Sequence, residues 1–149
     1  MTKILVMHGV NLDMLGKRDR THYGAATLAE INGRIAELGA ELGLEAEFFQ
    51  SNSEGDFVER IHAAHASDIR GIVVNAGAWT HYSYAIMDAF AILDIPIVEV
   101  HMSNIHAREE FRRFSVLAKV AKGSIAGFGI DSYLLGVRAL AGLAHTSPR

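Results

Sequence analysis

The feature that most constrains the fold is an alternation of short apolar runs with longer amphipathic segments. The apolar runs are rich in β-branched residues, as in strands that are covered on both faces. Between them, apolar residues recur every three or four positions, as along one face of a helix. The expected strands are Ile4–Met7, Leu44–Phe49, Ile69–Val74, Pro96–Val100 and Ser124–Phe128. The expected helices are Thr27–Leu42, Ser53–Ala66, Ser83–Leu93, a short one at Ile105–Phe111, and Ser132–Leu143.

This alternation predicts an α/β protein with a five-stranded parallel sheet and helices on both faces. Because crossovers between parallel strands are right-handed, the expected architecture is a three-layer sandwich of the flavodoxin-like kind. The chain has 149 residues and only two prolines, and no stretch reads as a linker. We therefore expect a single domain that spans residues 1–149.

Composition excludes several classes of function. The formal net charge is −3 without a basic cluster, so neither nucleic acid nor a membrane surface is an expected partner. The absence of cysteine excludes disulfides, thiolate nucleophiles and cysteine-based metal sites. No apolar stretch reaches the length of a membrane span, and the first one is too short for a signal peptide. A cytoplasmic protein is expected.

Polar segments follow four of the expected strands, at the point where each strand ends. In parallel α/β sheets these ends form one edge, where ligands bind near the topological switch point. Four polar or glycine-rich segments on one edge exceed what a core requires, and they predict a small-molecule site. The segments are His8–Asn11, Gln50–Asn52, Asn75–Ala78 and His101–Asn104.

Glu99 and His101 are candidates for acid–base chemistry. Strand alternation places both side chains on the same face. A carboxylate beside an imidazole fixes its tautomer and raises its basicity. The alternative is a histidine that only caps the end of a strand.

The loop after the first strand carries three cations and a phenol within residues 17–23. Tyrosine, with a reference pKa of about 10, is a poor base near neutrality unless a neighbouring cation favours its phenolate. Arg18 and Tyr23 therefore suggest a general base on a mobile lid. The alternative is a solvated charged loop with a packed tyrosine.

Two further segments carry groups suited to binding. Arg108 and Arg112 are expected one helical turn apart, where guanidinium groups recognise carboxylates. Alternatively, this is a surface helix on which Glu109 and Arg113 pair across one turn, and both interpretations can hold together. Asn75 and His81 offer donors for hydroxyl groups.

Motifs of common cofactor and metal sites are not found. The chain has no GxGxxG, no GxxxxGK[ST], no GxSxG and no HExxH. Neither a metal nor a cofactor is therefore expected.

Five ordered segments resemble the type II 3-dehydroquinate dehydratases, from about Lys3 to Leu140. The likeness covers nearly the full chain, and five matches in the same order are highly specific. The matching segments are Gly9–Gly16, Gln50–Gly55, Asn75–Ala78 with Thr80–His81, Glu99–Asn104 and Arg108–Arg112.

The resemblance implies dehydration of 3-dehydroquinate to 3-dehydroshikimate through an enolate, without a cofactor. This reaction belongs to aromatic amino acid biosynthesis (the shikimate pathway) and to quinate catabolism. Tyr23 matches the general base, and Arg18 matches the arginine that favours its phenolate. Asn11 matches the residue that holds a water at the enolate. His101, oriented by Glu99, matches the general acid.

The resemblance also implies a substrate-binding set and an assembly. Asp88 matches a position that a neighbouring subunit presents to the site. Family members form homododecamers, tetramers of trimers, so a homo-oligomer is expected. The matching substrate-binding residues are Asn75, His81, Asp88, Met102, Ser103 and Arg112.

The chain departs from the family pattern at four positions. Val10 replaces a common proline, Asp13 and Met14 replace asparagine and leucine, and Phe114 replaces histidine. None of these changes removes an expected catalytic group. Three alternatives stay open: a flavin-holding flavodoxin-like module, a catalytically silent relative that serves assembly or regulation, and a lyase or isomerase acting on a related polyol acid.

Overall fold

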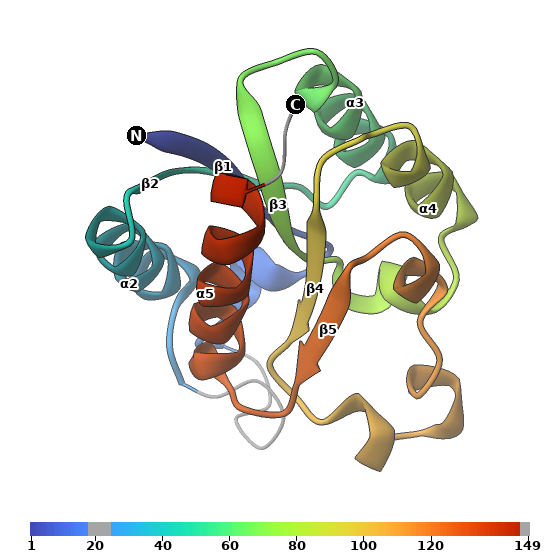
Figure 1. Cartoon of the computed structure of the whole chain (residues 1–149). Coiled ribbons are helices and arrows are strands. Elements are labelled where there is room, and N and C mark those ends of the chain that lie inside the picture. The colour runs from blue at the N-terminus through green and yellow to red at the C-terminus, as the bar shows by residue number, and fades with distance from the viewer. Residues whose placement is uncertain (18–24, 147–149) are drawn as a thin grey trace.

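A computed structural model describes residues 1–17 and 25–146. The described residues form a five-stranded parallel sheet in the order β2-β1-β3-β4-β5 (Figure 1). The order reverses between β1 and β3, and this is the switch point of a flavodoxin-like sheet. The predicted fold class is confirmed, and the five predicted strands are found. The strands are β1 (Thr2–His8), β2 (Leu44–Gln50), β3 (Ile69–Asn75), β4 (Ile97–His101) and β5 (Gly123–Ala126).

The main helices cover the two faces of the sheet (Figure 1). Helices α2 (Leu28–Glu41) and α5 (Ile130–Thr146) lie together on one face. Helices α3 (Glu54–Ala64) and α4 (Tyr84–Ala91) lie together on the other. The sequence predicts these helices to within a few residues.

The central strand β1 shows why the expected strands are apolar on both sides. Leu5 and Met7 pack toward α3 and α4, whereas Ile4 and Val6 pack toward α2 and α5. All four side chains are fully buried. Burial of an aliphatic side chain of this size stabilises a fold by about 1.5–3 kcal/mol, so both faces of β1 hold the layers together.

Short 3-10 helices replace one predicted helix. Where a helix over Ile105–Phe111 is expected, the chain forms η3 (Ile105–Ala107) and η4 (Glu110–Arg112). The backbone of Arg108 is extended between them, with φ −101° and ψ −166°. The prediction of one helix is wrong because the segment contains no buried stripe long enough to favour a continuous α-helix. Further 3-10 helices are η1 (Leu12–Met14), η2 (Gly77–His81) and η5 (Val116–Lys119).

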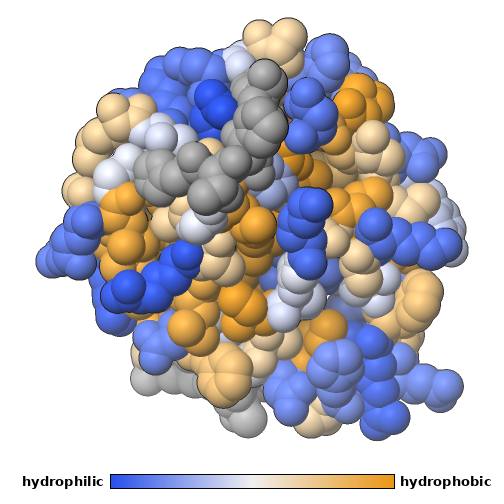
Figure 2. All heavy atoms as spheres, viewed as in Figure 1, coloured by the Kyte–Doolittle hydropathy of each residue, from blue (hydrophilic) through white to orange (hydrophobic). Residues whose placement is uncertain are grey.

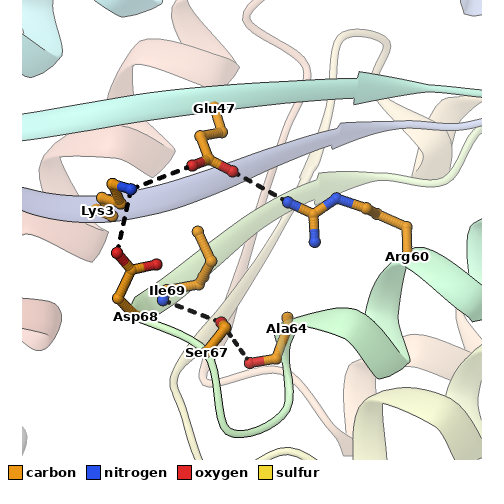
Figure 3. Close-up of polar contacts among 7 residues, drawn as sticks. All are labelled: Lys3, Glu47, Arg60, Ala64, Ser67, Asp68 and Ile69. Atoms are coloured by element: carbon orange, nitrogen blue, oxygen red, sulfur yellow. Dashed lines mark hydrogen bonds and ion pairs between the residues drawn. The ribbon is translucent and has the colours of Figure 1, made fainter.

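The amino-terminal edge of the sheet carries a network of ion pairs (Figure 3). Lys3 Nζ lies 3.1 Å from Asp68 and 3.7 Å from Glu47, and Arg60 lies 3.1 Å from Glu47. The hydrogen bond to Asp68 raises the pKa of Lys3. The network joins β1, β2 and α3 at the edge opposite the strand ends that carry the predicted site.

Candidate active site

The polar strand ends meet in a pocket of about 110 Å³ at the carboxyl edge of the sheet. The loops after β1, β3 and β4 and the 3-10 helices beyond β4 form its wall. Among the described residues, the pocket contains every predicted site residue except Glu99 and Asp88. Its lining is Val10, Asn11, Leu12, Asn75, Gly77, Ala78, His81, His101, Met102, Ser103, Ile105, Arg108 and Arg112.

A buried pair of a carboxylate and an imidazole lies behind the pocket. Glu99 Oε2 is 2.6 Å from His101 Nε2, and the two side chains are 0% and 5% exposed. Because Nε2 is engaged by Glu99, Nδ1 is the nitrogen available for exchanging a proton with a bound molecule. Both residues leave the same strand, so the backbone of β4 fixes their relation as strand alternation predicts.

Ser115 is a third member of this group, and it is not among the residues predicted from the sequence. Its hydroxyl donates a hydrogen bond of 2.7 Å to Glu99 Oε2 and accepts one from the backbone N–H of Leu117. Among the described residues, the second oxygen of Glu99, Oε1, has no hydrogen-bond partner. A buried carboxylate needs such donors, because burial alone disfavours its charge.

His81 faces the same pocket from η2. Its Nδ1 donates a hydrogen bond of 2.8 Å to the backbone carbonyl of Phe114, and burial lowers its pKa. The imidazole is therefore neutral near pH 7, and Nε2 remains as an acceptor. The N–H donor of this neutral imidazole is therefore engaged by the Phe114 carbonyl. Phenylalanine at position 114 preserves this contact because only the backbone takes part.

Asn11 is held in a tight turn after β1. Its backbone is left-handed, with φ 67°, a conformation that asparagine adopts more readily than most residues. Its N–H donates a hydrogen bond of 2.8 Å to the Asn52 side chain, whose amide nitrogen lies 3.3 Å from Asp13 Oδ2. The loop after β2 therefore supports the loop after β1, and aspartate at position 13 retains this bond.

Arg112 lies in an ion pair beside the pocket. Its Nε donates a hydrogen bond of 2.6 Å to Glu109, which lowers the pKa of that carboxyl. The alternative pairing, Glu109 with Arg113, is not found, since Arg113 donates instead to the carbonyl of Arg108. Arg108 and Arg112 both line the pocket, but they do not share one helical face.

Among the described residues, two predicted site residues, Glu99 and Asp88, do not line this pocket. Asp88 is exposed on α4. Arg18 and Tyr23 fall within residues 18–24, outside the described residues. Within the described residues, 1–17 and 25–146, no group of histidine, aspartate and glutamate side chains is arranged to hold a metal ion. In the same part of the chain, no helix is long and apolar enough to cross a membrane.

The arrangement suits acid–base chemistry on a small polar molecule. The His101–Glu99 pair can deliver a proton, and the carboxylate stabilises the charged imidazole. His81 offers an acceptor and Arg112 a positive charge, both toward the same space. These groups fit a compact substrate that carries hydroxyl and carboxylate groups.

Comparisons with known proteins show which family the chain belongs to. Residues 2–141 match the model of the family described as dehydroquinase class II. A 3-dehydroquinate dehydratase of Syntrophotalea carbinolica is 64% identical over 143 residues, 96% of this chain and 97% of the relative. That of Leptothrix cholodnii is 59% identical and covers 97% of each chain. The crystal structure of type II dehydroquinase from Propionibacterium acnes has a TM-score of 0.91 and 43% identity, covering 95% of this chain and 97% of that one.

Proposed function

The chain belongs to the class II dehydroquinase family, and we propose that it dehydrates 3-dehydroquinate to 3-dehydroshikimate. The observation that carries this proposal is the buried Glu99–His101 pair at the pocket, with its 2.6 Å hydrogen bond. Loss of water from a hydroxylated ring needs an acid for the departing hydroxyl, and His101 is the proposed acid.

The first step is removal of a proton from the carbon beside the ring ketone. Tyr23, as a phenolate favoured by Arg18, is the proposed base. The electron pair of the broken C–H bond moves toward the ketone and gives an enolate. A water held by Asn11, which lines the pocket, is proposed to stabilise the enolate oxygen.

The second step expels the hydroxyl group. The enolate reforms the ketone, a carbon–carbon double bond forms, and the carbon–oxygen bond breaks. His101 gives the proton on Nδ1 to the departing hydroxyl, which leaves as water. The hydrogen on Nε2 stays on that nitrogen and is donated to Glu99. The Glu99 carboxylate stabilises the imidazolium before the proton is transferred. Return of one proton from Tyr23 to His101 through solvent resets the enzyme.

The remaining pocket residues are proposed to hold the substrate. Arg112 suits a carboxylate or ring hydroxyl, and the backbone at Met102 and Ser103 suits the carboxylate. His81 accepts from a hydroxyl through Nε2, and Asn75 binds a further oxygen. All of them line the pocket.

The site is proposed to be completed by a neighbouring copy in a homododecamer. Asp88 lies outside the pocket of its own chain and on the exposed side of α4. Tyr84 and Ile92, one turn away on either side, are 64% and 55% exposed. Exposed apolar residues one turn apart suit a contact with another copy.

The enone chromophore of the product provides the test. Purified protein is mixed with 3-dehydroquinate, and ultraviolet absorbance is followed. We expect turnover by the wild type. Tyr23→Phe and His101→Ala should each lower kcat by a factor of about 100 or more, the usual contribution of a general base or acid.

A matched control is His106→Ala, because His106 is an exposed histidine outside the pocket lining. Circular dichroism checks that every variant folds. Failure of the wild type to convert 3-dehydroquinate would reject the function. Unchanged rates in both folded variants would reject the roles of Tyr23 and His101.

A further inference from the structure

A continuous chain of hydrogen bonds runs from the pocket into the layer between the sheet and α2. Gly77 N–H donates to Asn75 Oδ1 at 3.1 Å, and Asn75 Nδ2 donates to the Tyr133 hydroxyl at 3.1 Å. That hydroxyl lies 2.8 Å from His8 Nδ1. His8 Nε2 lies 2.7 Å from Asn32 Oδ1. These hydrogen bonds join β3, α5, β1 and α2.

The backbone N–H of Gly77 determines which atom donates and which accepts in each of these hydrogen bonds. It can only donate, so the Asn75 atom that it meets is the oxygen, and the amide nitrogen faces Tyr133. Because that nitrogen can only donate, the Tyr133 oxygen accepts and its own hydrogen points to His8 Nδ1. The hydrogen on His8 Nε2 then points to the carbonyl oxygen of Asn32.

Burial of His8 and Tyr133 prevents the donors and acceptors in these hydrogen bonds from exchanging roles. His8 and Tyr133 are both fully buried. Burial lowers the pKa of His8 to about 4 and raises that of Tyr133, so both are neutral near pH 7. With a proton on His8 Nδ1, the Tyr133 hydroxyl would receive two donors, and its own hydrogen would have no acceptor within the chain of bonds. A buried hydroxyl without a partner is unfavourable.

We propose that Tyr133 and His8 are positioning residues that hold the Asn75 amide with its second N–H toward the pocket, as a donor to a substrate oxygen. Asn75 lines the pocket, and its amide is anchored at both ends, by Gly77 and by Tyr133. This inference deepens the proposed function and rests on the pocket being the dehydroquinate site.

The consequence concerns selectivity for the substrate. With the amide held this way, Asn75 gives a donor, whereas Nε2 of His81 gives an acceptor. A hydroxyl group can satisfy both roles, and a group that only accepts or only donates cannot. The pocket is thereby matched to a hydroxylated ring.

Tyr133→Phe is the test variant, because it keeps the ring and removes only the hydroxyl. We expect kcat/KM for 3-dehydroquinate to fall about tenfold, as for loss of one well-placed hydrogen bond. In an Asn75→Ala background the same change should alter kcat/KM by less than about twofold, since the effect passes through Asn75. Tyr82→Phe, an exposed tyrosine, is the matched control.

A purely structural role for Tyr133 would lower kcat/KM by the same factor in both backgrounds. That result, or an unchanged kcat/KM in Tyr133→Phe, would overturn the proposal.

The tautomer of His8 gives a second readout that does not depend on catalysis or on any variant folding. Imidazole ¹⁵N resonances of the wild type at pH 7 should show Nε2 protonated and Nδ1 bare. A proton on Nδ1 would contradict the proposed directions of these hydrogen bonds and overturn the proposal, even if turnover is normal. Absence of turnover by the wild type, with the expected tautomer, would instead count against the proposed function alone.

Discussion

At the scale of single residues, the site depends on how Glu99 is held. Its side chain is fully buried, and one oxygen, Oε2, receives both described hydrogen bonds, from His101 and Ser115. A buried carboxylate keeps its charge only where donors replace water. Ser115 therefore helps to hold the carboxylate that orients the proposed acid.

Removal of the Ser115 hydroxyl should slow the chemical step more than it weakens binding. For Ser115→Ala we expect kcat to fall roughly tenfold, the loss of one hydrogen bond to a charged group, while KM stays within about twofold. Ser115→Thr keeps the hydroxyl and should recover most of the rate. Steady-state kinetics measure the three proteins, and an alanine variant as fast as the wild type would contradict the assigned role.

His8 should make stability depend on pH. Because its pKa is lowered to about 4 in the folded state, the unfolded state binds the proton first as pH falls below 6.5. The free energy of unfolding should therefore decrease between pH 6.5 and 4, by roughly 3 kcal/mol from this group. Urea unfolding of the wild type and His8→Asn measures it. The stability difference between them should shrink over that range, and a constant difference would refute the assignment.

At the scale of elements, the ends of β1 and β3 approach so closely that only glycine fits between them. A Cβ at Gly9 would overlap the backbone carbonyl of Ala76. The Gly9 N–H also donates a hydrogen bond of 2.7 Å to the carbonyl of Asn75. This contact aligns the loop that carries Asn11 with the end of β3, which carries Asn75, at the pocket.

Two glycine substitutions should therefore have opposite effects. Gly9→Ala forces the two strand ends apart and should lower the free energy of unfolding by more than about 2 kcal/mol, with loss of activity. Gly33→Ala in α2 meets nothing within 4 Å and should raise it by roughly 0.5–1 kcal/mol. Thermal and urea unfolding compare both variants with the wild type, and equal effects would show that the close approach is unimportant.

Periodicity made the strands and main helices predictable, because each buries an unbroken stripe. Thr27 even caps α2 through the Glu30 N–H, at 3.2 Å, as the Thr-x-x-Glu pattern suggests. The segment after β4 was mispredicted because its 3-10 turns are set by caps such as Asn104, whose side chain accepts from His106 N–H. Local patterns do not encode such turns reliably.

The pocket was predictable only in part, for a physical reason. Glu99 and His101 are two residues apart on a strand, so the sequence already relates them. Ser115 is 16 residues from Glu99, and Tyr133 is 125 residues from His8. Such partners meet only through the tertiary fold. A buried tyrosine on the inner stripe of α5 was the one available signal, since its hydroxyl requires a partner.

At the scale of the whole molecule, several large apolar side chains are exposed on the surface. Figure 2 shows hydrophobic residues exposed between hydrophilic ones on one face. Large exposed apolar side chains also include Tyr84 and Ile92 on either side of Asp88. The proposed assembly would bury part of this surface and bring Asp88 to a neighbouring pocket.

A charged side chain beside Asp88 on the exposed side of α4 should break the proposed assembly. For Ile92→Asp we expect a lower molar mass by size exclusion with light scattering, together with reduced turnover. A charged residue buried without a partner at an interface is strongly unfavourable. Ala63→Asp, on the exposed side of α3, is the matched control and should leave the mass unchanged. An unchanged mass for Ile92→Asp would contradict the placement of the contact.

The most direct test of the central claim separates the two proton transfers. Folded variants are incubated with 3-dehydroquinate in D₂O, and proton NMR follows deuterium entering the carbon beside the ketone. If Tyr23 forms the enolate and His101 expels the hydroxyl, His101→Ala should exchange that hydrogen without forming the enone. Tyr23→Phe should do neither. Exchange that persists in Tyr23→Phe but disappears in His101→Ala would contradict the account.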